Sequence, residues 1–324
     1  MKDKNILITG GSGSFGKVFI QKALDQGCKR IVCYSRDELK QSVMQQEIKD
    51  DRVRYFIGDV RDKERLKIAF KGIDLVTHCA ALKQVPACEY NSIEAVKTNI
   101  LGAQNVIEAA IETGVKKVMA LSTDKAVNPL NAYGASKLMA EKLFISGNSY
   151  ASGTSTNISC VRYGNVVNSR GSVIPLFLKQ ACKGQLTVTD FDMTRFFITL
   201  DKAVDFVIKA IDDQIGGEIF IPIMPACEIF DIAKIIADKY DCEIEETGIR
   251  PGEKLHEKLI ASGEIAVKQE NRYVVIPNTP MFDRGEVKGK VLTDLEYSSN
   301  NAKPLSKKEI TEIIDSCNAG CKCR

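Results

Sequence analysis

The sequence has little histidine, no tryptophan and no long apolar run. Its two histidines, His78 and His256, are too few for a histidine-based zinc site or a Ser-His-Asp triad, so we expect no metal centre. No segment approaches the ~18 apolar residues of a membrane span. The N-terminus MKDKNILITG leads directly into a strand-like segment, so we expect no signal peptide and no membrane partner. The 45 basic and 42 acidic residues leave a net charge of +3, which predicts no binding to nucleic acid or to a membrane surface.

Cysteine is more plentiful, with eleven residues. Cys33, Cys79 and Cys160 stand inside predicted elements, where a small buried thiol is the usual interpretation. The spacing does not resemble a secreted disulfide framework, so we expect a reducing, cytoplasmic location. Three cysteines stand together near the C-terminus: Cys317, Cys321 and Cys323. A mobile tail is the favoured interpretation of this cluster, and a metal site is the alternative.

The first half of the chain alternates short apolar runs with amphipathic stretches. The runs are rich in Val and Ile and predict buried strands at 5–9, 30–35, 53–58, 74–79, 117–122 and 157–162. The stretches between them predict helices at 14–26, 36–48, 62–70, 92–113 and 132–145. This alternation is typical of an α/β fold, and we expect a Rossmann-type doubly wound parallel sheet with helices on both faces.

The rhythm changes after about residue 163. Helices are expected at 173–183, 199–213, 228–239 and 306–317, and a strand at 217–221. We therefore predict a first domain over 1–166, to which segments around 196–222 return. A smaller, interleaved C-terminal domain and the tail would occupy most of 167–324.

The first predicted strand runs into Gly10-x-x-Gly13-x-x-Gly16, and a helix follows. This is the position that a dinucleotide-binding turn requires. Gly10 permits the turn, Gly13 lets the backbone approach a pyrophosphate, and Gly16 lets helix and strand pack closely. A plain turn would also explain three glycines. A mononucleotide loop is disfavoured, because Val18 stands where a Ser or Thr must ligate magnesium.

The end of the second strand predicts which dinucleotide binds. NAD enzymes usually place an acidic residue there, but this chain has Ser35 and Arg36. A guanidinium suits a 2′-phosphate, so we predict NADP, with Lys40 adding charge. The alternative is that Arg36 is a solvated surface residue. Asp59, after the third strand, would meet the adenine, and Ala80 would leave room for the cofactor.

A catalytic pair is expected on the helix after the fifth strand. Tyr133 and Lys137 are four residues apart and therefore share a helix face. A nearby ammonium would lower the pKa of the tyrosine, which could then exchange a proton with a substrate hydroxyl.

Taken together, several stretches give the chain a specific resemblance. They are ILITGGSGSFGK, YSRDELKQ, FIGDVRDKERL, STDKAVNPLNAYGASKL, VRYGNVVNSRGSVIP, MTRFFITL, GGEIFIP and IRPGEKLHE. The chain resembles the extended short-chain dehydrogenases/reductases. Within them it is similar to the inverting UDP-N-acetylglucosamine 4,6-dehydratases that begin pseudaminic acid synthesis. The resemblance runs from residue 5 to about residue 257, and the region from Met281 onward is assigned no function.

The resemblance implies an NADP-dependent lyase that acts on UDP-N-acetylglucosamine. Its product would be UDP-2-acetamido-2,6-dideoxy-beta-L-arabino-hex-4-ulose. The first domain would bind NADP and the second the substrate, and relatives are homo-oligomers, often hexamers. Tyr133 would take the proton of the carbon-4 hydroxyl, Asp124 would protonate the departing carbon-6 hydroxyl, and Lys125 would remove the carbon-5 proton. Such a lysine needs a depressed pKa, which burial beside NADP would provide.

The resemblance also implies the binding residues. The cofactor would be held by Gly10, Ser12, Gly13, Ser14, Phe15, Gly16, Ser35, Arg36, Asp37, Glu38, Leu39, Lys40, Asp59, Val60, Ala80, Lys83, Thr98, Asn99, Tyr133 and Lys137. The substrate would contact Lys83, Asn165, Val173, Thr189, Arg195, Arg250 and Glu253.

Other interpretations stay open. Gln84 and Asn168 depart from close relatives, where we expect His and Gly. Asp124 and Lys125 could form an ordinary surface ion pair. The same scaffold carries UDP-sugar 4-epimerases and retaining 4,6-dehydratases, although Lys125 argues against typical versions of both. A non-catalytic NADP-binding regulator would usually lack the Tyr133–Lys137 pair.

Overall fold

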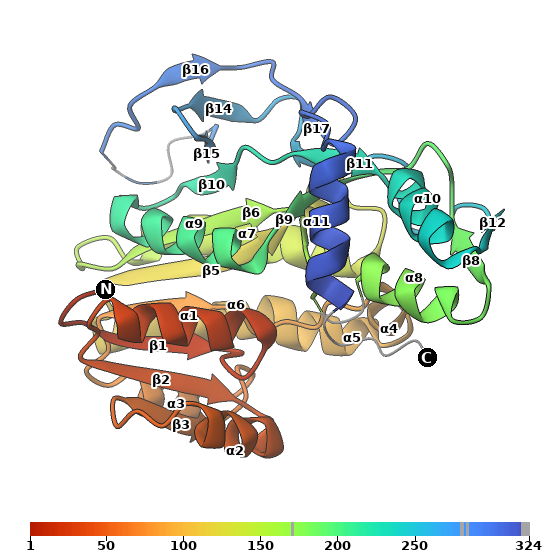
Figure 1. The fold of residues 1–324 in the computed structure, drawn as a ribbon. Helices are drawn as coiled ribbons and strands as arrows, with labels where there is room; N and C mark the ends of the chain where they lie inside the picture. The colour runs from red at the N-terminus through yellow and green to blue at the C-terminus, as the bar shows by residue number, and fades with distance from the viewer. Residues whose placement is uncertain (170–171, 279–281, 283–284, 319–324) are drawn as a thin grey trace.

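The computed structural model describes residues 1–169, 172–278, 282 and 285–318. Its centre is a ten-stranded sheet in the order β16-β14-β15-β10-β6-β5-β4-β1-β2-β3 (Figure 1). The strands from β3 to β10 along this order are parallel to one another. Their bounds are β1 Asn5–Thr9, β2 Arg30–Ser35, β3 Val53–Ile57, β4 Leu75–His78, β5 Lys117–Thr123, β6 Asn157–Tyr163 and β10 Ile219–Pro222. The predicted α/β class with a Rossmann-type parallel sheet is therefore confirmed.

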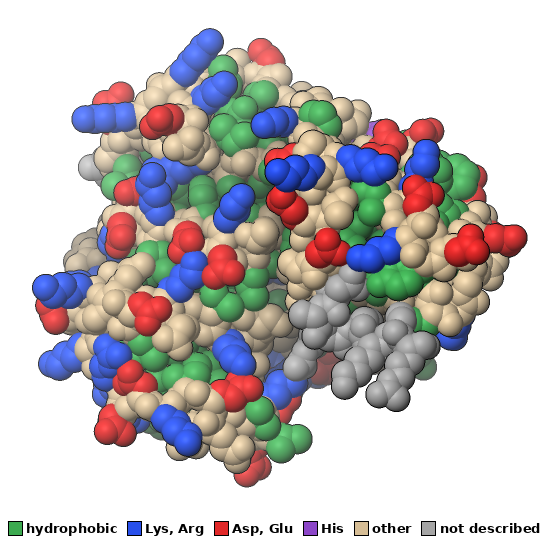
Figure 2. Space-filling model, viewed as in Figure 1, with side chains coloured by type: hydrophobic (Ala, Val, Ile, Leu, Met, Phe, Trp, Pro, Cys, Tyr) green, Lys and Arg blue, Asp and Glu red, His purple; other side chains and the backbone are tan. Residues whose placement is uncertain are grey.

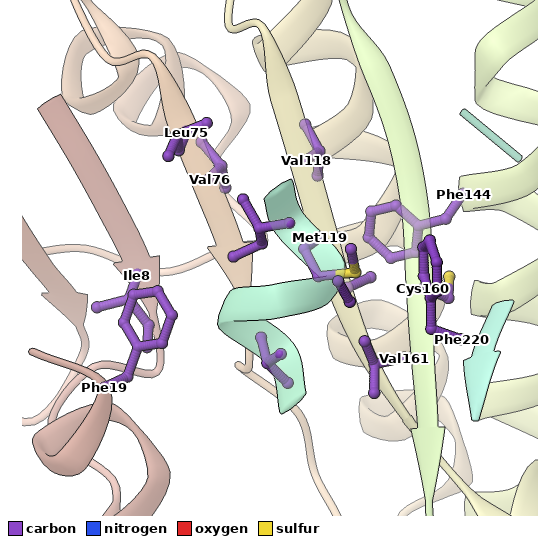
Figure 3. Packing of buried hydrophobic residues seen from close by; sticks show 14 of the residues in the cluster. Ile8, Phe19, Leu75, Val76, Val118, Met119, Phe144, Cys160, Val161 and Phe220 are labelled. Carbon is purple, nitrogen blue, oxygen red and sulfur yellow. The ribbon is translucent and has the colours of Figure 1, made fainter. Parts of the chain in front are cut away.

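The parallel strands form where the sequence is apolar on both faces. Ile6, Leu7 and Ile8 are consecutive in β1 and are all fully buried, as expected for a strand covered by helices on both sides. Figure 3 shows the resulting core, in which Phe19 of α1 and Phe144 of α7 pack among side chains of the sheet.

Helices cover both faces of this sheet (Figure 1). On one face α1 (Ser14–Asp25) contacts α9 (Leu200–Asp213). On the other face α6 (Gly102–Thr113) contacts both α3 (Lys63–Phe70) and α7 (Ala132–Tyr150). Helix α2 (Glu38–Glu47) is capped at its N-terminus by Asp37, whose side chain accepts a hydrogen bond from the backbone N–H of Lys40.

The predicted helix over 92–113 is interrupted. It consists of α5 (Ser92–Ala95), a π-helical segment (Val96–Leu101) and α6. The sequence analysis also missed α4 (Val85–Tyr90), which precedes it. A π-helical turn widens the helix locally and often marks a functional site. Here it carries Thr98 and Asn99, two of the predicted cofactor residues.

A second apolar cluster lies beside the large sheet. It joins α8 (Val173–Ala181), α10 (Ile229–Tyr240) and α11 (Lys307–Asn318). Small sheets complete this part of the chain. They pair β7 (Asn165–Val166) and β11 (Ala226–Glu228) with β9 (Thr194–Ile198), β8 (Gln185–Val188) with β12 (Glu243–Glu246), and β13 (Lys258–Ile260) with β17 (Tyr297–Ser298).

The chain returns to the large sheet more often than the sequence suggested. The predicted return at β10 is present, because β10 pairs with β6. Three later antiparallel strands also join the sheet: β14 (Ile265–Lys268), β15 (Arg272–Ile276) and β16 (Lys290–Leu292). The domain limits 1–166 and 167–324 stay a prediction. The structure differs from it in that β14, β15 and β16 also join the large sheet.

Two observations describe the molecule as a whole. Among the described residues, no helix is both long and apolar enough to cross a membrane. Figure 2 shows acidic and basic side chains interspersed over the visible face, as the small net charge suggests.

A buried ion cluster ties α7 to the last part of the chain. Arg162 of β6 donates two hydrogen bonds to Glu141 of α7, at 3.0 and 2.7 Å, and two to Glu264, both at 3.0 Å. Arg162 and Glu141 are each 1% exposed. Carboxylates buried this deeply are tolerated because the guanidinium is present.

We expect Arg162→Met to destabilise the protein strongly, because it leaves Glu141 buried without its partner. The free energy of unfolding should fall by about 3–5 kcal/mol in a urea titration. Arg54→Met, at a side chain that contacts backbone carbonyls at the edge of the sheet, is the matched control. A loss at Arg162 no larger than the loss at Arg54 would contradict this account of the cluster.

Candidate active site

A cleft of about 960 Å³ opens at the carboxyl ends of β1, β2, β4, β5 and β6. This is the edge at which open α/β sheets bind their ligands. Most of the predicted cofactor residues line the cleft: Gly10, Ser12, Gly13, Ser14, Phe15, Gly16, Ser35, Arg36, Asp37, Lys40, Asp59, Val60, Ala80, Lys83, Thr98, Tyr133 and Lys137. Three do not line it: Glu38, Leu39 and Asn99.

The glycine-rich turn is built as the sequence predicted. The N–H of Gly13 donates to the carbonyl of Gly10 at 2.9 Å, which closes the turn between β1 and α1. A Cβ on Gly16 would lie 2.2 Å from the carbonyl oxygen of Gly11, so a larger residue would push the helix away from the turn. The first N–H groups of α1 therefore remain close to the cleft, where they favour an anion.

The end of β2 presents both signs of charge. Arg36 lines the cleft with 53% of its side chain exposed, and one of its nitrogens lies 3.6 Å from a carboxylate oxygen of Asp59. Burial opposes ionisation of Asp59, but hydrogen bonds from Arg61 outweigh it and lower the Asp59 pKa. Lys40 is paired with Asp37, so it adds less net charge to the cleft than its sequence position suggested.

Tyr133 and Lys137 project from the first turns of α7, which Asn131 caps by accepting from the N–H of Gly134. The ammonium of Lys137 donates to the carbonyl of Leu121 at 2.7 Å, which anchors it to β5. A Cβ on Gly134 would lie 2.3 Å from the carbonyl of Lys125. Glycine at this position lets the catalytic helix lie directly against the turn that follows β5.

The predicted lowering of the Tyr133 pKa by its helix neighbour is not what the structure shows. Burial dominates and raises the pKa of Tyr133 to about 12, against the opposing effects of Lys125 and of a hydrogen bond with Thr123. The cation that acts on the phenol is Lys125 rather than Lys137. Burial also lowers the pKa of Lys137.

Asp124 and Lys125 form a pair whose carboxylate is buried and whose ammonium is partly exposed at the cleft, so it is not an ordinary surface ion pair. Asp124 is 1% exposed, and its Oδ1 lies 3.2 Å from the ammonium of Lys125. The same oxygen accepts a hydrogen bond from the hydroxyl of Thr123 at 2.9 Å. The pair follows β5 in a short 3₁₀ turn, and Lys125 lines the cleft while Asp124 lies behind it.

A second carboxylate, which the sequence analysis missed, reaches the same lysine. Glu257 is 3% exposed, and its Oε1 lies 3.4 Å from the ammonium of Lys125. Its other oxygen lies 3.3 Å from the ammonium of Lys254. Glu257 ends the IRPGEKLHE stretch, so the motif marked the segment, but nothing in the motif showed that it folds back against β5.

The pKa values of the two carboxylates, Asp124 and Glu257, shift in opposite directions. Burial, with the negative charge of Glu257, raises the pKa of Asp124 despite Lys125. Burial is outweighed at Glu257, where Lys125, Arg195 and Lys254 lower the pKa. Burial opposes the charged form of Lys125, but Asp124 and Glu257 raise its pKa above the usual value. Burial by the protein alone therefore does not depress the pKa of Lys125, and the depressed pKa expected beside NADP stays a prediction.

The predicted substrate residues fall into two groups. Lys83, Asn165, Arg250 and Glu253 line the cleft, whereas Val173, Thr189 and Arg195 do not. Arg195 is 7% exposed and donates to the carbonyls of Thr194, Lys254 and Leu255. Those bonds hold the segment that carries Glu257. Asn99 likewise makes two hydrogen bonds to the backbone of Leu82.

The structure also locates the two residues that depart from close relatives, Asn168 and Gln84, and the first cysteine of the C-terminal cluster, Cys317. Asn168 adopts φ +58°, a left-handed conformation that Gly and Asn tolerate best, so it can replace the expected Gly without a change of turn. Gln84 lines the cleft just before α4. Cys317 is buried in the second apolar cluster, and Cys321 and Cys323 lie outside the described residues.

The cleft also presents buried polar atoms without a protein partner in the described part of the chain. They belong to Thr98, Ser122, Ser172 and Glu253. Such atoms are costly to bury unless a ligand or water completes them. Together with the glycine turn, they fit a dinucleotide and a polar substrate.

The Rossmann sheet, the glycine-rich turn and the Tyr133–Lys137 pair define a protein of the extended short-chain dehydrogenase/reductase type. Comparison with known proteins narrows this class. A sequence model described as "Polysaccharide biosynthesis protein" matches residues 6–278, and the chain belongs to this family.

Three similar proteins cover nearly the whole chain. A Campylobacter jejuni protein named UDP-N-acetylglucosamine 4,6-dehydratase (inverting) is 48% identical, over 96% of this chain and 97% of its own. A Rickettsia conorii protein named UDP-glucose 4-epimerase is 43% identical, over 96% of this chain and 95% of its own. The crystal structure of Pen from Bacillus thuringiensis is 39% identical with a TM-score of 0.90, and covers 98% of both chains. The resemblance drawn from the motifs is thereby confirmed.

Proposed function

We propose that the protein is an NADP-dependent UDP-N-acetylglucosamine 4,6-dehydratase that inverts carbon 5. The observation that carries the proposal is the buried Asp124–Lys125 pair, which lies beside Tyr133 at the cleft. A dehydratase needs an acid and a base in addition to the tyrosine, and the pair provides both. The name of the Campylobacter jejuni relative supports the substrate and the stereochemical outcome.

The reaction divides between cofactor and protein. When bound, oxidised NADP supplies a positive charge that favours the tyrosinate and a centre that accepts hydride from carbon 4 and returns it to carbon 6. Tyr133 takes the proton of the carbon-4 hydroxyl. The ketone formed at carbon 4 acidifies the proton on carbon 5, which makes removal of water across carbons 5 and 6 possible.

The pair can reach its reactive form by moving one proton. Lys125 and Asp124 are in direct contact at 3.2 Å, and the Asp124 pKa is raised. Transfer from ammonium to carboxylate gives a neutral amine, which can remove the carbon-5 proton, and a carboxylic acid, which can protonate the departing carbon-6 hydroxyl. The two transfers return the pair to its ionic form, so the elimination itself consumes no outside proton. Return of hydride to carbon 6 leaves carbon 5 to be protonated, and the proton that Tyr133 took from the carbon-4 hydroxyl balances the one that carbon 5 gains.

Charge in the cleft supports the choice of ligands. Arg36 lines the cleft just after β2, and its guanidinium suits a 2′-phosphate, which supports NADP as the cofactor. Arg250 lines the same cleft and suits a diphosphate. The proposal therefore includes NADP and UDP-N-acetylglucosamine as ligands. By resemblance alone, the proposal also includes a role in the first step of pseudaminic acid synthesis, a cytoplasmic location and a homo-oligomeric state.

A UDP-sugar 4-epimerase is the second candidate. The Rickettsia relatives with that name are 43% identical or slightly less, so the scaffold alone does not separate the two. A retaining dehydratase is a variant of the first proposal. A non-catalytic regulator is disfavoured because Tyr133 and Lys137 both line the cleft.

Proton NMR of the purified protein with UDP-N-acetylglucosamine and NADP in deuterium oxide tests the function. We expect a 4-keto-6-deoxy sugar of L-arabino configuration with deuterium at carbon 5. A D-xylo product formed first would identify a retaining enzyme. UDP-N-acetylgalactosamine would identify an epimerase, and no turnover of any UDP-sugar would favour the regulator.

Tyr133→Phe separates catalysis from binding. The phenyl ring keeps the packing of Tyr133 but cannot carry the proton, so turnover should fall by about 10²- to 10⁴-fold. The NADP dissociation constant, measured by calorimetry, should change little. Tyr150→Phe, at the exposed end of the same helix, is the matched control and should keep full turnover. Equal losses in both variants would remove Tyr133 from the mechanism.

Arg36→Ala tests the cofactor choice. Loss of a charge-assisted contact to the 2′-phosphate should raise the NADP dissociation constant roughly 10- to 100-fold. The NAD dissociation constant should stay within about twofold, because NAD has no 2′-phosphate. Arg54→Ala, whose side chain does not line the cleft, is the control. An equal weakening of NAD and NADP would show that Arg36 does not select between them.

A further inference from the structure

We propose that Glu257 is a positioning residue whose carboxylate holds the Lys125 ammonium and supplies a fixed negative charge behind the Asp124–Lys125 pair. The inference rests on the proposed function, since it assigns this pair the acid and base steps. Three observations carry it. They are the contact of Glu257 with Lys125 at 3.4 Å, the burial of Glu257 at 3% exposure, and its origin in a segment far from β5 in the sequence.

The backbone at Glu257 is fixed without help from its carboxylate. The N–H of Glu257 donates to the hydroxyl of Ser299 at 3.0 Å, and its carbonyl accepts from the N–H of Ser299 at 2.8 Å. The hydroxyl of Ser298 donates to the same carbonyl at 3.2 Å. Because these contacts do not involve the side chain, the carboxylate can be replaced while the segment stays in place.

The segment before Glu257 is equally well fixed. Arg195 donates to the carbonyls of Lys254 and Leu255 at 2.9 and 3.0 Å. The N–H of Thr194 donates to the carbonyl of Leu255 at 3.1 Å. These bonds join the segment to β9, and they set where the Glu257 carboxylate ends. Lys125 is therefore contacted by carboxylates from two separate parts of the chain, Asp124 beside it and Glu257 from this segment.

The charges around this cluster are few and well defined. Lys125 is affected by Asp124, Glu257, Arg195 and Tyr133. Glu257 is affected by Lys125, Arg195 and Lys254. With three cations around it, Glu257 remains an anion. Asp124 lacks such support and its Oδ2 has no hydrogen-bond partner in the described structure.

A fixed anion raises the affinity of both members of the pair for a proton. Its negative charge raises the pKa of Asp124 and also that of Lys125. The pair titrates as a unit with two macroscopic steps, and it is active with one mobile proton. Glu257 therefore shifts both steps to higher pH, and it keeps the amine directed by a contact that Asp124 alone does not provide.

The test is the pH profile of kcat for Glu257→Gln. Removing the charge lowers the proton affinity of Asp124 and of Lys125, so both limbs of the profile should move to lower pH. The expected displacement is roughly one pH unit or more. The maximal kcat should also fall, with KM for the UDP-sugar changed much less. Glu257→Asp keeps the charge, and it should restore the midpoints even where kcat stays below that of the unchanged protein.

Glu264→Gln is the matched control, because Glu264 also pairs with a buried cation, Arg162, away from Lys125. It should lose stability but keep the wild-type midpoints. Glu257→Gln with wild-type midpoints, whether or not kcat falls, would overturn the proposal and leave Glu257 with a structural role only.

A measurement without substrate keeps this test independent of the proposed reaction. The carboxyl carbon of Asp124 can be followed by NMR in protein labelled with ¹³C-aspartate, with the resonance assigned by Asp124→Asn. In Glu257→Gln the Asp124 titration should move to lower pH. An unmoved titration refutes the role of Glu257. A moved titration in a protein that dehydrates no UDP-sugar refutes the proposed function instead.

Discussion

The site depends on the contacts of the Lys125 ammonium with two buried carboxylates, those of Asp124 and Glu257. Asp124 follows β5, whereas Glu257 belongs to a segment bonded to β9 and to Ser298–Ser299. Burying either carboxylate alone would be costly, and each is tolerated because a cation faces it. The two parts of the chain must therefore be in register for this pocket to form. The energetic coupling between them passes through a side chain that lines the cleft.

Arg195 illustrates how such a constraint changes the interpretation of a motif. The resemblance implied that Arg195, which stands in MTRFFITL, contacts the substrate, and an arginine is well suited to bind a diphosphate. In the structure its donors are engaged by three backbone carbonyls, two of them in the segment before Glu257. Its effect on substrate would then be indirect, through the placement of Glu257. Arg250, by contrast, lines the cleft, where it can meet a ligand directly.

Features set by local sequence could be predicted, and features set by distant packing could not. The strands of the parallel sheet, the glycine turn and the Tyr133–Lys137 pair each follow from spacing within a short window. Strands β14–β16 pair with distant partners, and short antiparallel edge strands carry weak local signals. The π-helical turn has no sequence pattern of its own. Glu257 was invisible as a site residue for the same reason, because its role exists only after residues 254–257 return to β5.

The protonation states were the least predictable part of the site. The sequence analysis expected an ammonium to lower the pKa of Tyr133 and burial to lower the pKa of Lys125. Both effects are present in the structure. The expected direction was nevertheless wrong for Tyr133, because burial exceeds the effect of its cation. At Lys125 two carboxylates exceed the effect of burial by the protein. A pKa is a small difference between large opposing contributions, so identifying the neighbours does not give the direction.

The balance of these charges also bears on how one scaffold carries different chemistries. A 4-epimerase needs only the tyrosine and a cofactor that accepts and returns a hydride at the same carbon. A dehydratase must in addition place an acid and a base beside carbons 5 and 6, in protonation states that are opposite to those of the free side chains at neutral pH. An isolated Asp-Lys pair in water would remain an ion pair. In this protein burial raises the proton affinity of Asp124, which brings the neutral acid-and-base form within reach. The fixed charge of Glu257 raises the proton affinity of both members of the pair, so it sets the pH range in which the pair holds its one mobile proton. The chemistry that distinguishes the two activities would then reside less in the residues that touch the sugar than in the buried charge behind them.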